Sequence, residues 1–147
     1  MKKIKYKELK NYKYQIVEGC SIQTEIKSEK DIFEPNEKFP YIVLSKNGIL
    51  SIFPGYAWDG ASGIAIDTKN FMRGSLVHDA LYQLMRKGKI GLEYRDDADR
   101  LLQKICKEDG MSSFRAFNVY QAVKLFGESS ASPTDKKEVQ ETILEAP

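Results

Sequence analysis

Residues 74–87, G-S-L-V-H-D-A-L-Y-Q-L-M-R-K, decide how the second half of the chain folds. Val77, Leu81 and Leu84 recur in this stretch at steps of four and three residues, the spacing that places side chains on one face of an α-helix. Gly88 follows directly and is a natural stop for a helix. The pattern therefore predicts an amphipathic helix over residues 74–87.

Two further helices are predicted after this stretch. Residues 95–108 repeat the apolar helical pattern. Ser112 or Ser113 is suited to cap a third helix, which runs through Phe126 and ends at Gly127. We expect this third helix to direct an apolar face to the core. The residues expected on that face are Phe114, Phe117, Tyr120 and Val123.

The first half of the chain is predicted to form strands. Four segments have the alternation or the content of β-branched and aromatic residues that is typical of strands: residues 12–17, 21–27, 41–45 and 49–53. Asn47-Gly48 between the last two predicts a hairpin. The charged residues 28–40 and the glycine-rich residues 54–73 are expected to form loops.

These patterns together predict an α+β fold, with a small N-terminal antiparallel β-sheet followed by three α-helices. A single domain is expected over residues 12–127, between a basic arm at 1–11 and a polar, acidic tail at 128–147. The charged ends are either solvated or, for the arm, suited to contact phosphate or an anionic surface. No recognition motif or interleaving of aromatic residues indicates specific nucleic-acid binding.

The composition limits the chemistry that the chain can perform. Its 147 residues include a single histidine, His78, which excludes two-histidine zinc sites and Cys2His2 fingers. The sequence has no apolar run of about eighteen residues, so no transmembrane segment is expected. No apolar segment follows the basic N-terminus, so no signal peptide is expected either. Any catalytic chemistry therefore uses at most one imidazole.

His78 and Tyr82 lie one turn apart on the first predicted helix, whereas Asp79 points about 100° round it. Asp99 lies on the next helix, and the short connection over residues 88–94 predicts that the two helices are antiparallel neighbours. An inward-facing Asp99 would hydrogen-bond one ring nitrogen of His78, fix its tautomer and leave the other nitrogen as a base. Asp79 would then be available to hold a hard cation.

The run H-D-x-x-Y at residues 78–82, followed by an aspartate on a second helix, resembles secreted phospholipase A2. It resembles in particular the phospholipase domain of parvovirus capsid proteins, which also lacks the disulfides. The resemblance implies that His78 activates a water, that Asp99 orients the histidine and that Tyr82 supports them. It also implies a lipid substrate and calcium bound by Asp79. The other calcium ligands implied are backbone carbonyls of the preceding loop, at Trp58, Gly60 and Ser62.

A second resemblance covers roughly residues 12–127. Five motifs carry it in order: G-Y-A-W-D-G-A-S (55–62), R-G-S-L-V-H-D-A-L-Y (73–82), R-x-x-A-D (95–99), G-M (110–111) and A-V-K-L-F-G (122–127). They resemble the domain-of-unknown-function family 1353, which is common in tailed phages and prophages. The resemblance implies a phage-related origin, a place in the virion or the host cytoplasm, and other virion proteins as partners. It implies no established activity.

Two functions from different classes remain open for the His-Asp site. One is a calcium-assisted hydrolase that acts on a phospholipid or another cell-envelope ester. The other is a non-enzymatic phage virion or accessory protein, in which the motif forms a structural hydrogen-bonded knot. Asp59 is either a turn former or a second carboxylate at the metal beside Asp79. Arg95 and Asp99, four residues apart, are also spaced to form a simple pair on the helix surface.

Overall fold

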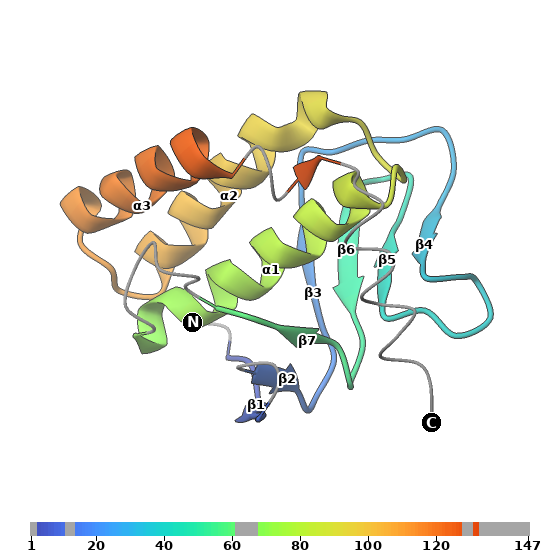
Figure 1. The fold of residues 1–147 in the computed structure, drawn as a ribbon, viewed down its shortest axis with the longest axis horizontal. Coiled ribbons are helices and arrows are strands. Elements are labelled where there is room, and N and C mark those ends of the chain that lie inside the picture. The colour runs from blue at the N-terminus through green and yellow to red at the C-terminus, as the bar shows by residue number, and fades with distance from the viewer. Residues whose placement is uncertain (1–2, 11–13, 61–67, 128–130, 133–147) are drawn as a thin grey trace.

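The fold places strands first and helices afterwards, as Figure 1 shows. The structure is a computed structural model, and it describes residues 3–10, 14–60, 68–127 and 131–132. Within these residues, antiparallel strands in the first part of the chain are followed by three α-helices. The predicted α+β class and the predicted order of elements are therefore confirmed.

The described chain contains a four-stranded antiparallel sheet in the order β3-β6-β5-β4. Its strands are β3 (Cys20–Gln23), β4 (Ile32–Glu34), β5 (Ile42–Leu44) and β6 (Ile49–Ile52). Strands β5 and β6 form the hairpin predicted from Asn47-Gly48, and Gly48 has the positive φ of 89° that such a turn favours. Strand β4 lies within residues 28–40, so the prediction of a loop there was wrong. Its three residues are too few to show an alternation, and its pairing with β5 is not visible in the local sequence.

A second antiparallel sheet has three strands among the described residues, in the order β1-β2-β7. They are β1 (Tyr6–Glu8), β2 (Tyr14–Ile16) and β7 (Ala57–Trp58). The sheet gathers three aromatic rings, with Tyr14 5.5 Å from both Tyr6 and Trp58 between ring centroids. Part of the expected basic arm is therefore a strand of a sheet, and part of the expected loop over residues 54–73 is its partner. Lys5 and Lys7 remain exposed to solvent.

Three α-helices and one short 3-10 helix follow. They are α1 (Lys69–Arg86), η1 (Leu92–Tyr94), α2 (Arg95–Glu108) and α3 (Ser113–Phe126). Helix α1 begins at Lys69 rather than at the predicted residue 74, because Phe71 and Met72 are buried and extend its apolar face toward the N-terminus. It stops before Gly88, whose φ is 70°, as predicted. Ser112 caps α3, because its Oγ accepts a hydrogen bond of 3.2 Å from the backbone N–H of Arg115.

The prediction of which α3 residues face the core was wrong in part. Tyr120 and Val123 are buried, but Phe114 is 78% exposed and Phe117 is 49% exposed. A helix turns by about 100° per residue, so each step of three residues moves a side chain about 60° backwards round the axis. Three such steps bring Val123 to the side opposite Phe114. The buried stripe instead includes Ala116 and Val119 with Val123.

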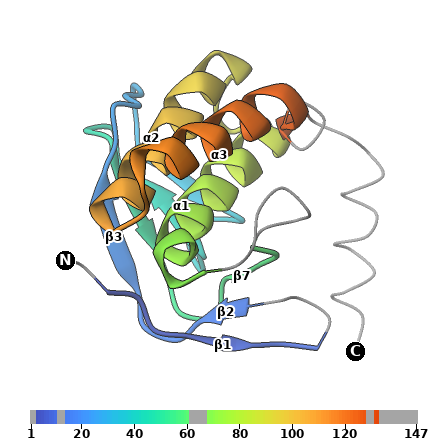
Figure 2. The same ribbon diagram turned by 90° about the vertical axis from the view of Figure 1, so that its left-hand side faces the viewer.

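Helices α1 and α2 pack against the four-stranded sheet, and the buried side of α3 packs against α1 and α2 in a second cluster (Figures 1 and 2). Helices α1 and α2 lie side by side and run in opposite directions (Figure 1), as predicted. Gly74 lies at this contact, where a Cβ atom would stand 2.9 Å from Cδ1 of Leu102 and 3.0 Å from Sγ of Cys106. Any larger residue at this position would force the Leu102 and Cys106 side chains to shift, so glycine favours this close approach of the two helices. No helix among the described residues has both the length and the hydrophobicity to span a bilayer.

Candidate functional site

His78 and Asp99 meet between α1 and α2. Atom Nε2 of His78 lies 2.7 Å from Oδ1 of Asp99. Both residues are buried, with His78 7% exposed and Asp99 1% exposed. Because a carboxylate oxygen accepts hydrogen bonds, Nε2 carries the proton and donates it. In the neutral ring Nδ1 is then unprotonated. The contact expected from the spacing of the two helices is present.

Tyr82 completes this contact from the turn after His78. Its hydroxyl donates a hydrogen bond of 2.6 Å to Oδ1 of Asp99, the same oxygen that accepts from His78. The Tyr82 ring also lies against the imidazole, with 4.0 Å between ring centroids. Burial, followed by the hydrogen bond to Asp99, raises the pKa of Tyr82 well above its usual value. The phenol therefore remains a hydrogen-bond donor at any ordinary pH.

Arg95 is a member of the site that the sequence did not single out as functional. Its Nε donates a hydrogen bond of 3.2 Å to the Tyr82 hydroxyl. Its Nη2 donates to the backbone carbonyls of Val123 and Lys124 at the end of α3. The guanidinium therefore joins the C-terminal end of α3 to Tyr82 instead of pairing with Asp99 on the surface of α2. The sequence signals at Arg95 were the R-x-x-A-D motif and its spacing of four residues from Asp99, and neither revealed the partner on α3.

Gly127 makes a second connection between the end of α3 and the site. A Cβ atom on Gly127 would stand 2.7 Å from the Tyr82 hydroxyl oxygen and 2.5 Å from the carbonyl oxygen of Val123. Its φ of −82° is open to any residue. The glycine is therefore required for space rather than for its backbone conformation, and it lets the chain pass directly over the Tyr82 hydroxyl.

The pKa of His78 depends on two opposing effects, the burial of its ring and the two carboxylates beside it. Burial disfavours the charged ring, whereas the hydrogen bonds and charges of Asp79 and Asp99 favour it. The balance raises the pKa of His78 above its ordinary value of 6.5. A higher pKa makes the ring a stronger proton acceptor, which is useful in a general base.

Asp79 faces the second ring nitrogen, with its Oδ1 4.0 Å from Nδ1 of His78. Its side chain is 32% exposed, which makes it the more accessible of the two carboxylates at the ring. Burial raises the pKa of Asp79, the imidazole opposes that rise, and the negative charge of Asp59 adds to it. Asp59 is thus close enough to repel the Asp79 carboxylate electrostatically. Hard oxygen donors with this mutual repulsion are of the kind that suits a hard divalent cation such as calcium.

The structure gives less support to the other predicted calcium ligands, which are Trp58, Gly60 and Ser62. The Trp58 side chain packs in the core and donates from Nε1 to Oγ of Ser75 over 3.0 Å, so only its backbone is available as a ligand. Gly60 is buried, with a φ of 76°. Ser62 lies outside the described residues. Within the described chain, no group of three or more histidine, cysteine, aspartate or glutamate side chains is arranged to hold a metal. The calcium site stays a prediction.

Comparison with known proteins returns no relative. No family model, no curated protein and no solved structure matches the chain. The resemblances to the phospholipases and to the phage-associated family therefore stay predictions. The side chains that converge on His78 are the features of the described chain that indicate a function.

Proposed function

We propose that this protein is a hydrolase in which His78 acts as a general base on the water that attacks an ester. The observation that carries the proposal is the 2.7 Å hydrogen bond between Nε2 of His78 and the buried carboxylate of Asp99. A general base needs an oriented ring and one fixed tautomer. The contact to Asp99 supplies both and leaves Nδ1 with its lone pair.

Each residue of the site has a separate role in this mechanism. Nδ1 of His78 takes a proton from water as the oxygen attacks the ester carbonyl, and the imidazolium later returns it to the leaving alcohol. Asp99 stabilises the imidazolium through the Nε2–H bond. Tyr82 and Arg95 are positioning residues, because they hold Asp99 without contacting the substrate. Calcium held by Asp79 would supply positive charge for the developing oxyanion.

The substrate class and the biological setting come from the two resemblances. A phospholipid ester is the substrate that the H-D-x-x-Y motif implies, and a phage could use such an activity during entry or release. The protein would then act in the virion or in the host cell. The exposed aromatic side chains on the outer face of α3, Phe114 and Phe117, are compatible with work at a lipid surface.

A second candidate function is a non-enzymatic role as a virion or accessory protein. It is favoured by the burial of the whole contact, because His78, Tyr82 and Asp99 are all less than a tenth exposed. In that role the polar cluster would specify how α1, α2 and the end of α3 pack together. Buried hydrogen-bonded networks of this kind rigidify a core when every member is satisfied.

His78→Gln separates the two functions, because a glutamine amide still donates to Asp99 but cannot act as a base. The hydrolase predicts that this variant stays folded by circular dichroism and loses at least about a hundredfold in hydrolysis of a dispersed phospholipid. It also predicts that calcium raises the melting temperature of the wild type, that Asp79→Asn abolishes the rise and that the surface control Asp97→Asn keeps it.

The structural role predicts a different set of results. The wild type would hydrolyse no ester with or without calcium, and no divalent cation would raise its melting temperature. His78→Ala would unfold the protein, because the buried Asp99 carboxylate would lose a charged hydrogen-bond partner. Full hydrolysis by His78→Gln would rule out the base assigned here.

A further inference from the structure

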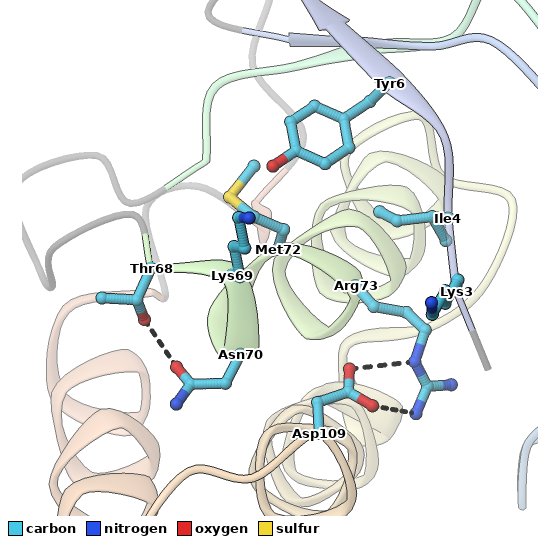
Figure 3. A pocket seen from close by; sticks show the side chains of 9 residues that line it. All are labelled: Lys3, Ile4, Tyr6, Thr68, Lys69, Asn70, Met72, Arg73 and Asp109. Carbon is cyan, nitrogen blue, oxygen red and sulfur yellow. Dashed lines mark hydrogen bonds and ion pairs between the residues drawn. The ribbon is translucent and has the colours of Figure 1, made fainter. Parts of the chain in front are cut away.

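A cavity of about 630 Å³ opens at the N-terminal end of α1, away from His78. Figure 3 shows its walls, which come from the N-terminal segment up to the first residue of β1, from the start of α1 and from Asp109 after α2. Lys3, Ile4 and Tyr6 border it on one side, and Lys69, Met72 and Arg73 on the other. The His-Asp contact takes no part in this cavity, and the proposed hydrolase makes no use of it.

The one deeply buried cation at the cavity is already satisfied. Arg73 is 7% exposed and makes a two-pronged ion pair with Asp109, with Nε to Oδ2 and Nη2 to Oδ1 both at 3.0 Å. Its Nη2 also donates to Glu108 over 3.0 Å. Figure 3 shows this pair among the side chains that line the cavity. Both oxygens of the Asp109 carboxylate are therefore occupied, and the cavity gains no free negative charge from it.

The groups left over at the cavity are hydrogen-bond donors. Within the described chain, Lys3 and Lys69 form no ion pair, and the Tyr6 hydroxyl has no hydrogen-bond partner. The side-chain oxygen of Asn70 already accepts from Thr68, and this leaves its NH2 group as a further donor. The first turn of α1 adds further donors, because its backbone N–H groups are not capped by a side chain. It also carries no acidic residue. Two positive charges thus stand at the cavity without an acceptor among the described residues.

The same cavity also has an apolar wall. Met72 is buried, and Ile4 and Tyr6 are half-buried and pack against the core. An anion that carries a short apolar group would pair with the two ammonium groups and cover this wall. A phosphomonoester fits better than a carboxylate, because its charge near −2 matches two lysines and its oxygens accept several hydrogen bonds.

We propose that the cavity between Lys3 and Lys69 binds a phosphomonoester that carries a short apolar chain. The phosphate oxygens accept from the two ammonium groups and from the Tyr6 hydroxyl, and the chain lies against Ile4 and Met72. The ligand is either a soluble phosphomonoester or the headgroup of an anionic lipid such as phosphatidate, since both present the same group.

Calorimetric titration of the full chain with butyl phosphate and with inorganic phosphate tests this site. Butyl phosphate binds more tightly than inorganic phosphate, because only it covers the apolar wall. The double variant Lys3→Gln/Lys69→Gln weakens butyl phosphate binding by about tenfold or more, and Tyr6→Phe weakens it by about threefold. The matched control is Lys7→Gln, an exposed lysine on β1 that does not line the cavity, which changes affinity by less than about twofold.

Sedimentation with vesicles distinguishes the two sources of the ligand. Binding to phosphatidylcholine vesicles that contain phosphatidate, lost in the double variant, identifies a lipid headgroup. Butyl phosphate binding without vesicle binding identifies a soluble phosphomonoester. The site is refuted if neither phosphate compound binds, if the double variant binds like the wild type, or if Lys7→Gln loses as much affinity as the double variant.

Discussion

Polar side chains at the middle of α1 differ from those at its N-terminal end in burial and in hydrogen bonding. At the middle, His78 and Tyr82 are buried, and each donates a hydrogen bond to the buried carboxylate of Asp99 on α2. At the N-terminal end, Lys3 and Lys69 are exposed and no partner for either is found in the described chain. Buried polar groups must be satisfied by the protein itself, whereas exposed donors remain free for a ligand. The first region therefore fixes one geometry, and the second is prepared to accept an anion.

Removing the charge of Asp99, which lies on α2 and contacts the middle of α1, gives the largest expected effect. Asp99→Asn keeps the shape of the side chain but weakens two hydrogen bonds in a buried place, so we expect a loss of about 2–4 kcal/mol in the free energy of unfolding. Hydrolysis falls by roughly 10²–10⁴ if His78 is a base. Urea titration and the phospholipid assay measure the two effects.

Lys69→Gln is the matched change at the N-terminal end of α1. It alters the free energy of unfolding by less than about 0.5 kcal/mol, because an exposed, unpaired side chain contributes little to folding. An equal loss of stability in the two variants would remove the contrast between the two regions.

Adding one methyl group at the end of α3 has the next largest effect. Gly127→Ala forces its Cβ against the Tyr82 hydroxyl, and we expect a loss of about 1–3 kcal/mol together with reduced hydrolysis. Gly88→Ala is the control, because Gly88 has a φ of 70° with no atom within 4 Å of the added Cβ. It should cost about 1 kcal/mol through backbone strain alone and leave hydrolysis unchanged. Unchanged hydrolysis in Gly127→Ala would show that Tyr82 tolerates displacement.

The smallest effect is a divergence of stability and activity with pH. The pKa of His78 is higher in the folded protein than its unfolded value of 6.5. Protonation of His78 therefore stabilises the fold fully below pH 6.5, and this stabilisation is lost as pH rises through the pKa of the folded state. General-base catalysis needs the neutral ring and therefore gains over the same range. As pH rises from about 6.5 through the folded pKa of His78, the free energy of unfolding should fall while hydrolysis rises. Subtracting the His78→Gln curve isolates this contribution, and a zero difference would contradict the raised pKa.

The sequence predicted the parts of the site that depend on local spacing. His78 and Tyr82 are one turn apart on a helix, and Asp99 lies on the next helix after a short connection, so their meeting follows from helix geometry. Arg95 and Gly127 were not predicted as site residues, because their contacts depend on where the end of α3 returns. The packing of the C-terminal end of α3 near Tyr82 is a tertiary contact, and the periodicity of the sequence does not reveal it.

The same division explains the differences in the fold. The hairpin of β5 and β6 was predictable, because Asn47-Gly48 determines its turn locally. Strand β4 was missed, because its three residues gain their structure from pairing with β5. The cavity was also not predictable, since Lys3 and Lys69 come together only when the N-terminal segment packs near the start of α1.

Gly74 has a consequence for any attempt to transfer this site to another protein. It lies one turn before His78 and allows α1 to approach Leu102 and Cys106 on α2. The distance between the two helix axes thus depends on a residue with no side chain, and the bond between His78 and Asp99 depends on that distance. A graft of the polar residues onto a helical hairpin with wider axis spacing would reproduce their identities without reproducing the bond.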